Sequence, residues 1–111
     1  MMVSTTGVKV EVKTNGSSHA GAEVFINWGQ IRPSQDYEYL VGQIVTPQEV
    51  IPYVIPKADI AKLIAAGNLK QQHGGKAATN ANTYIVNGKH PAWVYGYRTS
   101  WQALADRLRV Q

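Results

Sequence analysis

The sequence predicts one domain of mixed α/β class, in which a sheet of several strands is flanked by helices. The chain has 111 residues, the usual size of a single domain. Several segments alternate or run apolar over strand-like lengths, and two later segments repeat apolar residues at helical spacing. Hydrophobic residues make up 44% of the chain, enough for an ordinary globular core.

The first predicted strand covers residues 8–14 and alternates strictly between apolar and polar side chains. Successive side chains of a strand point to opposite faces, so its three valines share one face. The charged side chains share the other face: Lys9, Glu11 and Lys13.

Three more strands are predicted in the first half of the chain. Residues 22–28 form one, and a polar connection over residues 29–36 leads to a long apolar strand at 37–46. The short link to residues 49–55 predicts an antiparallel hairpin. Pro52 places the last of these strands at a sheet edge or a bulge, because proline cannot donate to a ladder.

The second half begins with a predicted helix at residues 57–66, which Gly67 ends. Residues 68–82 are polar and rich in Gly and Asn, which predicts a loop. A short strand at 83–86 and a turn at Asn87-Gly88 follow.

Residues 90–97 are expected to form one more strand. A final helix is expected to begin after Thr99 or Ser100, either of which can cap it. Its apolar stripe consists of Trp101, Leu104, Ala105 and Leu108.

The charge pattern favours a polyanionic partner. The net charge is +4, and no acid occurs between Asp59 and Asp106. A region of one sign suits nucleic acid, and a mildly basic solvated surface is the alternative. The residues expected to contact DNA phosphates are Lys70, Lys76, Arg98 and Arg107.

Several classes of protein are excluded or disfavoured. The chain has no cysteine, which rules out disulfides, thiolate metal sites and a cysteine nucleophile. It has no apolar run long enough to span a membrane and no signal peptide, so we expect a cytoplasmic protein. Gly-x-Ser-x-Gly and Walker-type loops are absent from the sequence.

The motif that carries chemistry is Glu11-Val12-Lys13 on the first predicted strand. Residues two apart on a strand project side by side, about 7 Å apart at their backbones. A carboxylate there can hold a hard divalent cation that activates water, and a neighbouring ammonium can stabilise negative charge. The alternative is a pair of charges that simply faces solvent.

Further segments follow this motif in a recognisable order. They are Phe25 to Trp28, Gln30-Ile31-Arg32, Asp36-Tyr37 and Ile55-Pro56-Lys57. With this order and spacing, residues 8 to 60 resemble restriction endonucleases of the PD-(D/E)XK superfamily.

The resemblance implies a restriction-endonuclease-like mixed sheet and magnesium-dependent (or manganese-dependent) hydrolysis of DNA phosphodiesters. It gives catalytic roles to Glu11, Lys13 and Gln30, and makes Glu11 a metal ligand as well. A homodimer that cuts both strands is expected.

The sequence departs from the family where its first metal-binding Asp should lie. No acid precedes Glu11, and the N-terminal elements of the family core are missing from the sequence. Another acid can replace that Asp, either Glu23, Asp36 or Glu38, or a second chain can supply it. The remaining alternative is an inactive remnant that binds DNA or assembles with a partner.

Overall fold

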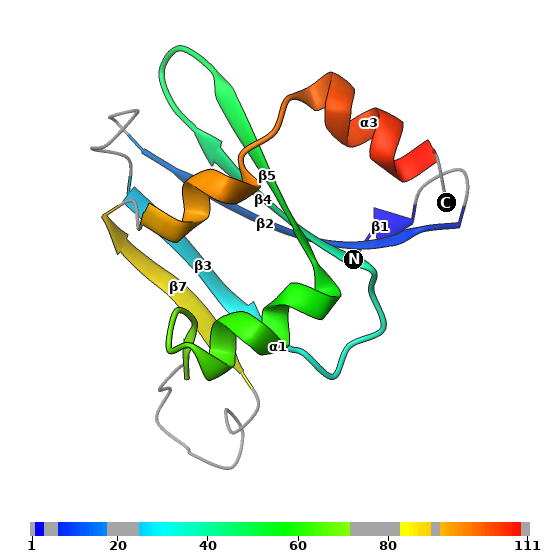
Figure 1. The fold of residues 1–111 in the computed structure, drawn as a ribbon. Helices are drawn as coiled ribbons and strands as arrows, with labels where there is room; N and C mark the ends of the chain where they lie inside the picture. The colour runs from blue at the N-terminus through cyan, green and yellow to red at the C-terminus, as the bar shows by residue number, and fades with distance from the viewer. Residues whose placement is uncertain (1, 4–6, 18–24, 72–82, 90–91, 110–111) are drawn as a thin grey trace.

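The computed structural model describes residues 2–3, 7–17, 25–71, 83–89 and 92–109. These residues form a mixed α and β structure with two small sheets and helices packed beside them (Figure 1). The elements in chain order are β1 (Met2–Val3), β2 (Lys9–Gly16), β3 (Phe25–Ile31), β4 (Tyr39–Val45), β5 (Val50–Pro56), α1 (Lys57–Ala65), β6 (Lys70–Gln71), β7 (Tyr84–Lys89), the 3-10 helix η2 (Ala92–Tyr97) and α3 (Trp101–Arg109).

The larger sheet has four strands in the order β1-β2-β4-β5. β2 runs parallel to β4, and β4 pairs antiparallel with β5, so the predicted hairpin is confirmed. β5 lies at the sheet edge, which is where Pro52 predicted it. The carbonyl of Pro52 on that edge accepts a hydrogen bond from the backbone N–H of Thr99 at 3.0 Å.

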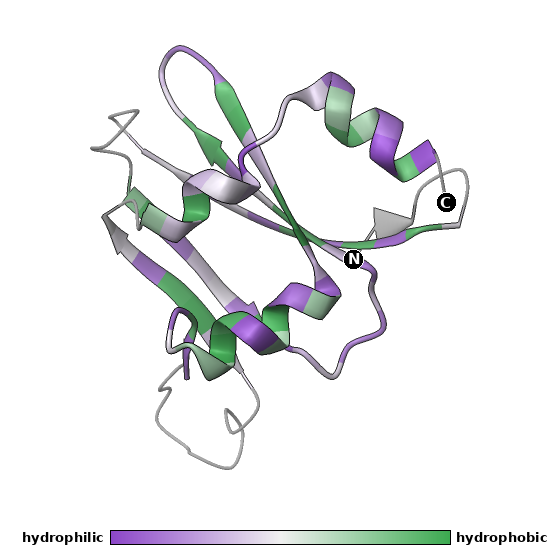
Figure 2. Ribbon diagram, viewed as in Figure 1, coloured by the Kyte–Doolittle hydropathy of each residue, from purple (hydrophilic) through white to green (hydrophobic). Residues whose placement is uncertain are grey.

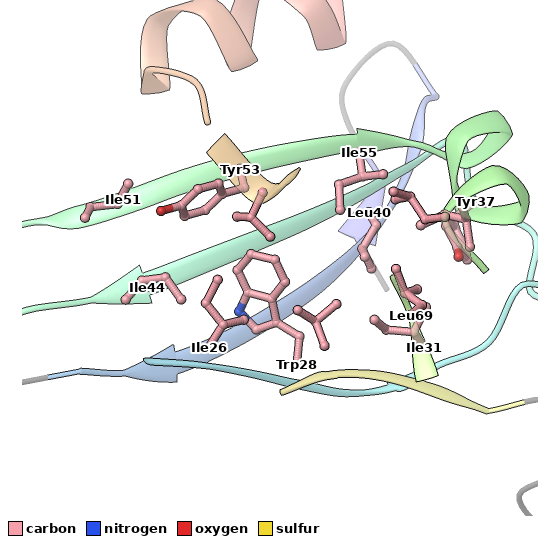
Figure 3. Packing of buried hydrophobic residues seen from close by; sticks show 14 residues of the cluster. Ile26, Trp28, Ile31, Tyr37, Leu40, Ile44, Ile51, Tyr53, Ile55 and Leu69 are labelled. Carbon is pink, nitrogen blue, oxygen red and sulfur yellow. The ribbon is translucent and has the colours of Figure 1, made fainter. Parts of the chain in front are cut away.

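The smaller sheet has three antiparallel strands in the order β3-β7-β6. Residues of both sheets and of α1 share one buried cluster (Figure 3). At its centre Trp28 of β3 meets Tyr53 of β5 edge to face, with ring centroids 5.5 Å apart. The two sheets therefore enclose the main core between them.

The register of β2 on β4 shows which residues face that core. Glu11 is aligned with Leu40 and Lys13 with Gly42, and aligned residues of neighbouring strands point to the same side of a sheet. Leu40 belongs to the main core, and the ring of Trp28 lies over Gly42. The polar face of β2 is therefore turned toward the smaller sheet.

The opposite face of the larger sheet is covered by α3. Its apolar side chains form a second cluster, which consists of Val8, Val10, Val41, Val54 and Leu104. The valines of β2 thus share one face, as their alternation predicted. The buried residues of the two helices are apolar: Ile60 and Leu63 in α1 and Leu104 in α3. Hydrophobic and hydrophilic residues are interspersed along both helices (Figure 2).

Both helices end or begin as the sequence predicts. Gly67 has φ 79°, and its backbone N–H donates to Ile64 O at 3.0 Å, which closes α1. The hydroxyl of Ser100 accepts a hydrogen bond from the N–H of Ala103 at 3.1 Å and so caps α3. No helix of the described segments is long and apolar enough to cross a membrane.

Two local predictions are wrong. Asn87 and Gly88 do not turn the chain, because they lie within β7 and pair with Asn27 and Ile26 of β3. Residues 92–97 form a 3-10 helix rather than a strand. In that helix the adjacent residues Trp93 and Val94 both contact the main core, which fits a helical turn and not a strand, because successive side chains of a strand point to opposite faces.

Other boundaries move by a few residues. β3 continues through Ile31, into the segment predicted as a polar connection. Within the predicted loop, Lys70–Gln71 forms a short edge strand, and residues 72–82 lie outside the described part. The predicted strand at 22–28 is described only from Phe25 onward.

Candidate functional site

The polar face of β2 forms a row of side chains along the seam between the two sheets. Asn15 lies at one end, where its side-chain amide donates to Phe25 O at 2.8 Å and its amide oxygen accepts from Asn27 N at 3.1 Å. Lys13 donates to Gln30 O at 3.0 Å. Side chains of β2 thus bind the backbone of β3 at both ends of that strand.

Glu11 and Lys13 lie side by side in this row, as the alternation predicted. The Lys13 Nζ is 3.8 Å from Glu11 Oε1. The Glu11 side chain is 12% exposed and the Lys13 side chain 16%, so neither simply faces solvent. A charged pair this sheltered is uncommon, because removing charges from water is costly unless they are paired and hydrogen-bonded.

Gln30 adjoins the pair at an irregular point of β3. The pairing of β3 with β7 shifts register between Trp28 and Ile31, and Gln30 has φ 57°. A non-glycine residue rarely adopts this conformation, and such bulges and strained residues concentrate at functional sites. Gln30 reaches Lys13 through its backbone carbonyl, while its side-chain oxygen accepts from Arg32 Nη2 at 2.9 Å.

Tyr37 is a part of this site that the sequence did not single out for a role. It is 2% exposed, and its hydroxyl has no hydrogen-bond partner within the described segments. Burial raises the pKa of Tyr37, and the negative charge of Glu11 raises it further. Tyr37 is therefore a buried polar group within electrostatic reach of Glu11. The Asp36-Tyr37 dipeptide is one of the segments that carry the family resemblance, but nothing in the dipeptide indicated that the hydroxyl would be buried without a partner among the described residues.

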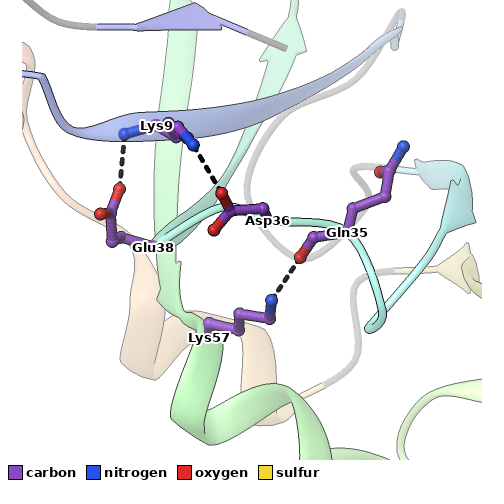
Figure 4. Close-up of polar contacts among 5 residues, drawn as sticks. All are labelled: Lys9, Gln35, Asp36, Glu38 and Lys57. Carbon is purple, nitrogen blue, oxygen red and sulfur yellow. Dashed lines mark hydrogen bonds and ion pairs between the residues drawn. The ribbon is translucent and has the colours of Figure 1, made fainter.

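Two acids beside β2 bind Lys9, the residue that precedes Glu11 on the same face (Figure 4). The Asp36 carboxylate forms an ion pair with the Lys9 ammonium, and Glu38 accepts the Lys9 backbone N–H. The hydrogen bond and charge of Lys9 hold the pKa of Asp36 below its usual value. The Asp36 side chain is 85% exposed, so it meets Lys9 in solvent rather than in the sheltered row.

The acids predicted as metal ligands are not brought together by the described residues. Across residues 2–3, 7–17, 25–71, 83–89 and 92–109, no three Asp, Glu or His side chains are grouped as a metal site. Asp36 is engaged with Lys9, and Glu23 lies outside the described part. Glu38, the fourth candidate, accepts the Lys9 backbone N–H, so Glu11 alone is placed beside Lys13.

The residues predicted to contact DNA fall in different places. Lys70 is exposed on β6, at the edge of the smaller sheet, and Lys76 lies outside the described residues. Arg98 and Arg107 line one pocket on the α3 side of the larger sheet. The guanidinium carbon of Arg107 is 5.3 Å from the ring centroid of Tyr39, which belongs to that face.

In comparisons with known proteins, no family model, curated protein or solved structure matches the chain.

Proposed function

We propose that this chain is a divalent-metal-dependent DNA endonuclease of the restriction-endonuclease-like type. The observation that carries the proposal is the sheltered pair of Glu11 and Lys13, with Nζ and Oε1 3.8 Å apart. It adjoins a strained bulge residue, Gln30, and a buried tyrosine hydroxyl without a partner within the described segments. Strained residues such as Gln30 gather at functional sites more often than at ordinary sheet faces.

The donor set fits a cation that arrives with the substrate. Mg²⁺ keeps several waters and is commonly held by one or two carboxylates together with substrate phosphates. Glu11 supplies one carboxylate. Further oxygens would come from a DNA phosphate, from water and from a second acid, for which Glu23, Asp36 and a partner subunit are the candidates. When bound, Mg²⁺ or Mn²⁺ would acidify a water and neutralise phosphate charge.

Lys13 has the role of holding charge on the phosphate. Its ammonium is positioned by two acceptors, Gln30 O at 3.0 Å and Glu11 Oε1 at 3.8 Å, so it needs little reorganisation when a phosphate approaches. Attack of a water oxygen on phosphorus breaks one P–O ester bond and releases a hydroxyl and a phosphomonoester end. Lys13 would stabilise the negative charge that grows on the phosphate oxygens in this step.

Plasmid nicking tests the proposal. We expect the wild-type chain to nick supercoiled DNA with Mg²⁺ or Mn²⁺, and chelation by EDTA to stop the reaction. Glu11→Gln and Lys13→Ala should each lower the rate by about 100-fold or more, the scale on which removal of one electrostatic contact in a transition state acts.

The matched control is Lys62→Ala, which removes an exposed lysine from α1 while leaving Glu11, Lys13 and Asp36 in place. It should nick within about twofold of wild type, since Lys62 takes no part in the proposed site. Asp36→Asn tests that acid as the second ligand. Equal nicking by wild type and Lys13→Ala contradicts the catalytic role.

The second candidate function is a DNA-binding or oligomeric module without cleavage, built on the same sheet. One observation favours it: the Lys13 ammonium and the Glu11 carboxylate already satisfy each other and the Gln30 carbonyl. Binding of DNA with no metal-dependent nicking supports this candidate. Sedimentation equilibrium tests the homodimer proposed with either function, in which a partner could complete the site or cover a sheet edge.

A further inference from the structure

A pocket of about 220 Å³ lies on the α3 side of the larger sheet, between the end of β5, the start of α1, η2 and α3. Its charged lining residues come from distant parts of the chain: Asp59, Arg98 and Arg107. Its other polar lining includes Tyr97 and Thr99. The volume falls below the roughly 300–1,000 Å³ of typical small-molecule pockets, so the pocket suits one compact polar group.

The arginines are presented by ordered backbone. Arg98 pairs in an isolated bridge with Tyr53 on the outer edge of β5, and its N–H donates to Tyr95 O at 3.2 Å. Arg107 comes from α3, and its guanidinium lies over the ring of Tyr39. A guanidinium carries its N–H donors in one plane, a geometry that suits planar anions and phosphates.

The acid of the pocket limits the charge of its ligand. Asp59 Oδ2 accepts the Tyr97 hydroxyl at 2.9 Å, so the carboxylate has a neutral partner. Two arginines and one aspartate leave one net positive charge in the lining. A group with a single negative charge matches that balance, and a phosphodiester carries one negative charge.

The pocket is separate from the Glu11–Lys13 site. Tyr39, under Arg107, packs with the cluster on the α3 face, whereas Glu11 is aligned with Leu40 on the opposite face. The pocket lining and the candidate catalytic pair are therefore on two sides of one sheet.

We propose that the Arg98–Arg107 pocket binds a phosphodiester group of DNA, as a docking site distinct from the place of cleavage. The inference rests on the proposed function only in taking DNA as the ligand. It assigns the two arginines to one contact, so their removal should act on binding and leave the chemistry of Glu11 and Lys13 intact.

Fluorescence anisotropy with a labelled duplex oligonucleotide tests this site. Arg98→Gln and Arg107→Gln should each raise Kd roughly tenfold, on the scale of a lost charge-assisted hydrogen bond. The double variant should lower the magnitude of the slope of log K against log salt by about one, the value for one phosphate. Arg98 is exposed, so Arg98→Gln keeps the test valid if replacement of Arg107 disturbs folding.

The matched control is Arg109→Gln, which removes the same charge from the same helix. Arg109 is exposed and pairs with Asp106, away from the pocket lining. It should bind within about twofold of wild type. A loss in Arg109→Gln equal to that in Arg98→Gln overturns the proposal, because the effect would then be one of net charge alone.

Asp59→Asn gives the opposite signature. Asparagine keeps an acceptor for Tyr97 but removes the negative charge, so DNA should bind several-fold tighter. Unchanged or weaker binding would place the phosphate elsewhere. Poly-glutamate at equal charge should compete poorly, and competition as strong as that of unlabelled duplex would assign the pocket to acidic peptides instead.

The two proposals fail in distinguishable ways. Lys13→Ala should lose nicking, and Arg98→Gln in that background should still weaken binding of the duplex. Wild-type nicking by Lys13→Ala removes the catalytic proposal and leaves the pocket standing if Arg98→Gln weakens binding. Tight binding by the Arg98→Gln, Arg107→Gln double variant removes the pocket and leaves the catalytic proposal standing.

Discussion

Tyr37 illustrates what a single buried group can reveal at the scale of one residue. Its hydroxyl is enclosed by the core, lacks a hydrogen-bond partner within the described segments and feels the charge of Glu11. A buried unsatisfied donor costs free energy, on the order of 1–3 kcal/mol. Tyr37→Phe removes the hydroxyl and keeps the ring, so we expect the free energy of unfolding to rise by about 1 kcal/mol.

The same residue predicts a dependence on alkaline pH. The pKa of Tyr37 in the folded chain is raised above its ordinary value of 10.0, chiefly by burial. The buried hydroxyl therefore stays neutral below pH 10, and the folded state loses stability as the pH rises from there through the folded-state pKa. Urea unfolding of wild type and Tyr37→Phe at neutral and alkaline pH measures both effects. A less stable Tyr37→Phe variant at neutral pH would mean that the hydroxyl is satisfied.

The residues of the candidate site were predictable to different degrees. Glu11 and Lys13 were paired correctly, because strand alternation is a local property that fixes which side chains share a face. The backbone role of Gln30 was not predictable, since it arises from a bulge formed on pairing with β7. The grouping of Arg98 with Arg107 depends on how α3 crosses the sheet, which no spacing in the sequence encodes.

At the scale of elements, β3 packs against β4 through one close contact between Trp28 and Gly42. A Cβ atom added at Gly42 of β4 would lie 2.4 Å from the indole ring of Trp28 on β3. Gly42→Ala should therefore destabilise the chain by about 1–3 kcal/mol, the usual cost of overpacking. Gly96→Ala is the control, because nothing lies within 4 Å of the Cβ that it adds.

Thermal and urea unfolding measure this difference directly. Replacement of Trp28 by Phe in the Gly42→Ala background should recover part of the loss, because the two positions are in contact and their effects are not additive. Equal stability of Gly42→Ala and wild type would show that the two sheets can move apart at no cost.

Elements fixed by short-range sequence patterns were predicted correctly, and elements fixed by contacts with distant segments were not. The hairpin of β4 and β5, both helices and their ends at Gly67 and Ser100 follow from short-range patterns, and all were predicted. The Asn87-Gly88 turn failed because pairing with β3 holds these residues extended. In η2 the packing of Trp93 and Tyr97 on the core overrides a strand-like composition.

At the scale of the whole molecule, the division into two sheets was beyond the sequence. Mixed α and β structure follows from the periodicities, but the parallel alignment of β2 with β4 and the separate β3-β7-β6 sheet depend on contacts between distant segments. The placement of the Glu11–Lys13 pair and the Arg98–Arg107 pocket on two sides of one sheet follows from that arrangement. The absence of acids between Asp59 and Asp106 therefore predicts that the second half of the chain is basic, but it does not predict where its basic side chains lie in the fold.

The two hydrogen bonds of Asn15 to β3 have a consequence for self-association of the chain in concentrated solution. An edge strand with unpaired N–H and C=O groups can pair with a strand of another copy. At this edge of β3 the Asn15 side-chain amide binds Phe25 O and Asn27 N instead. Asn15→Val should uncover this rim and make light scattering grow with protein concentration. Asn87→Val adds the same apolar bulk on an already paired strand, so its solutions should stay clear.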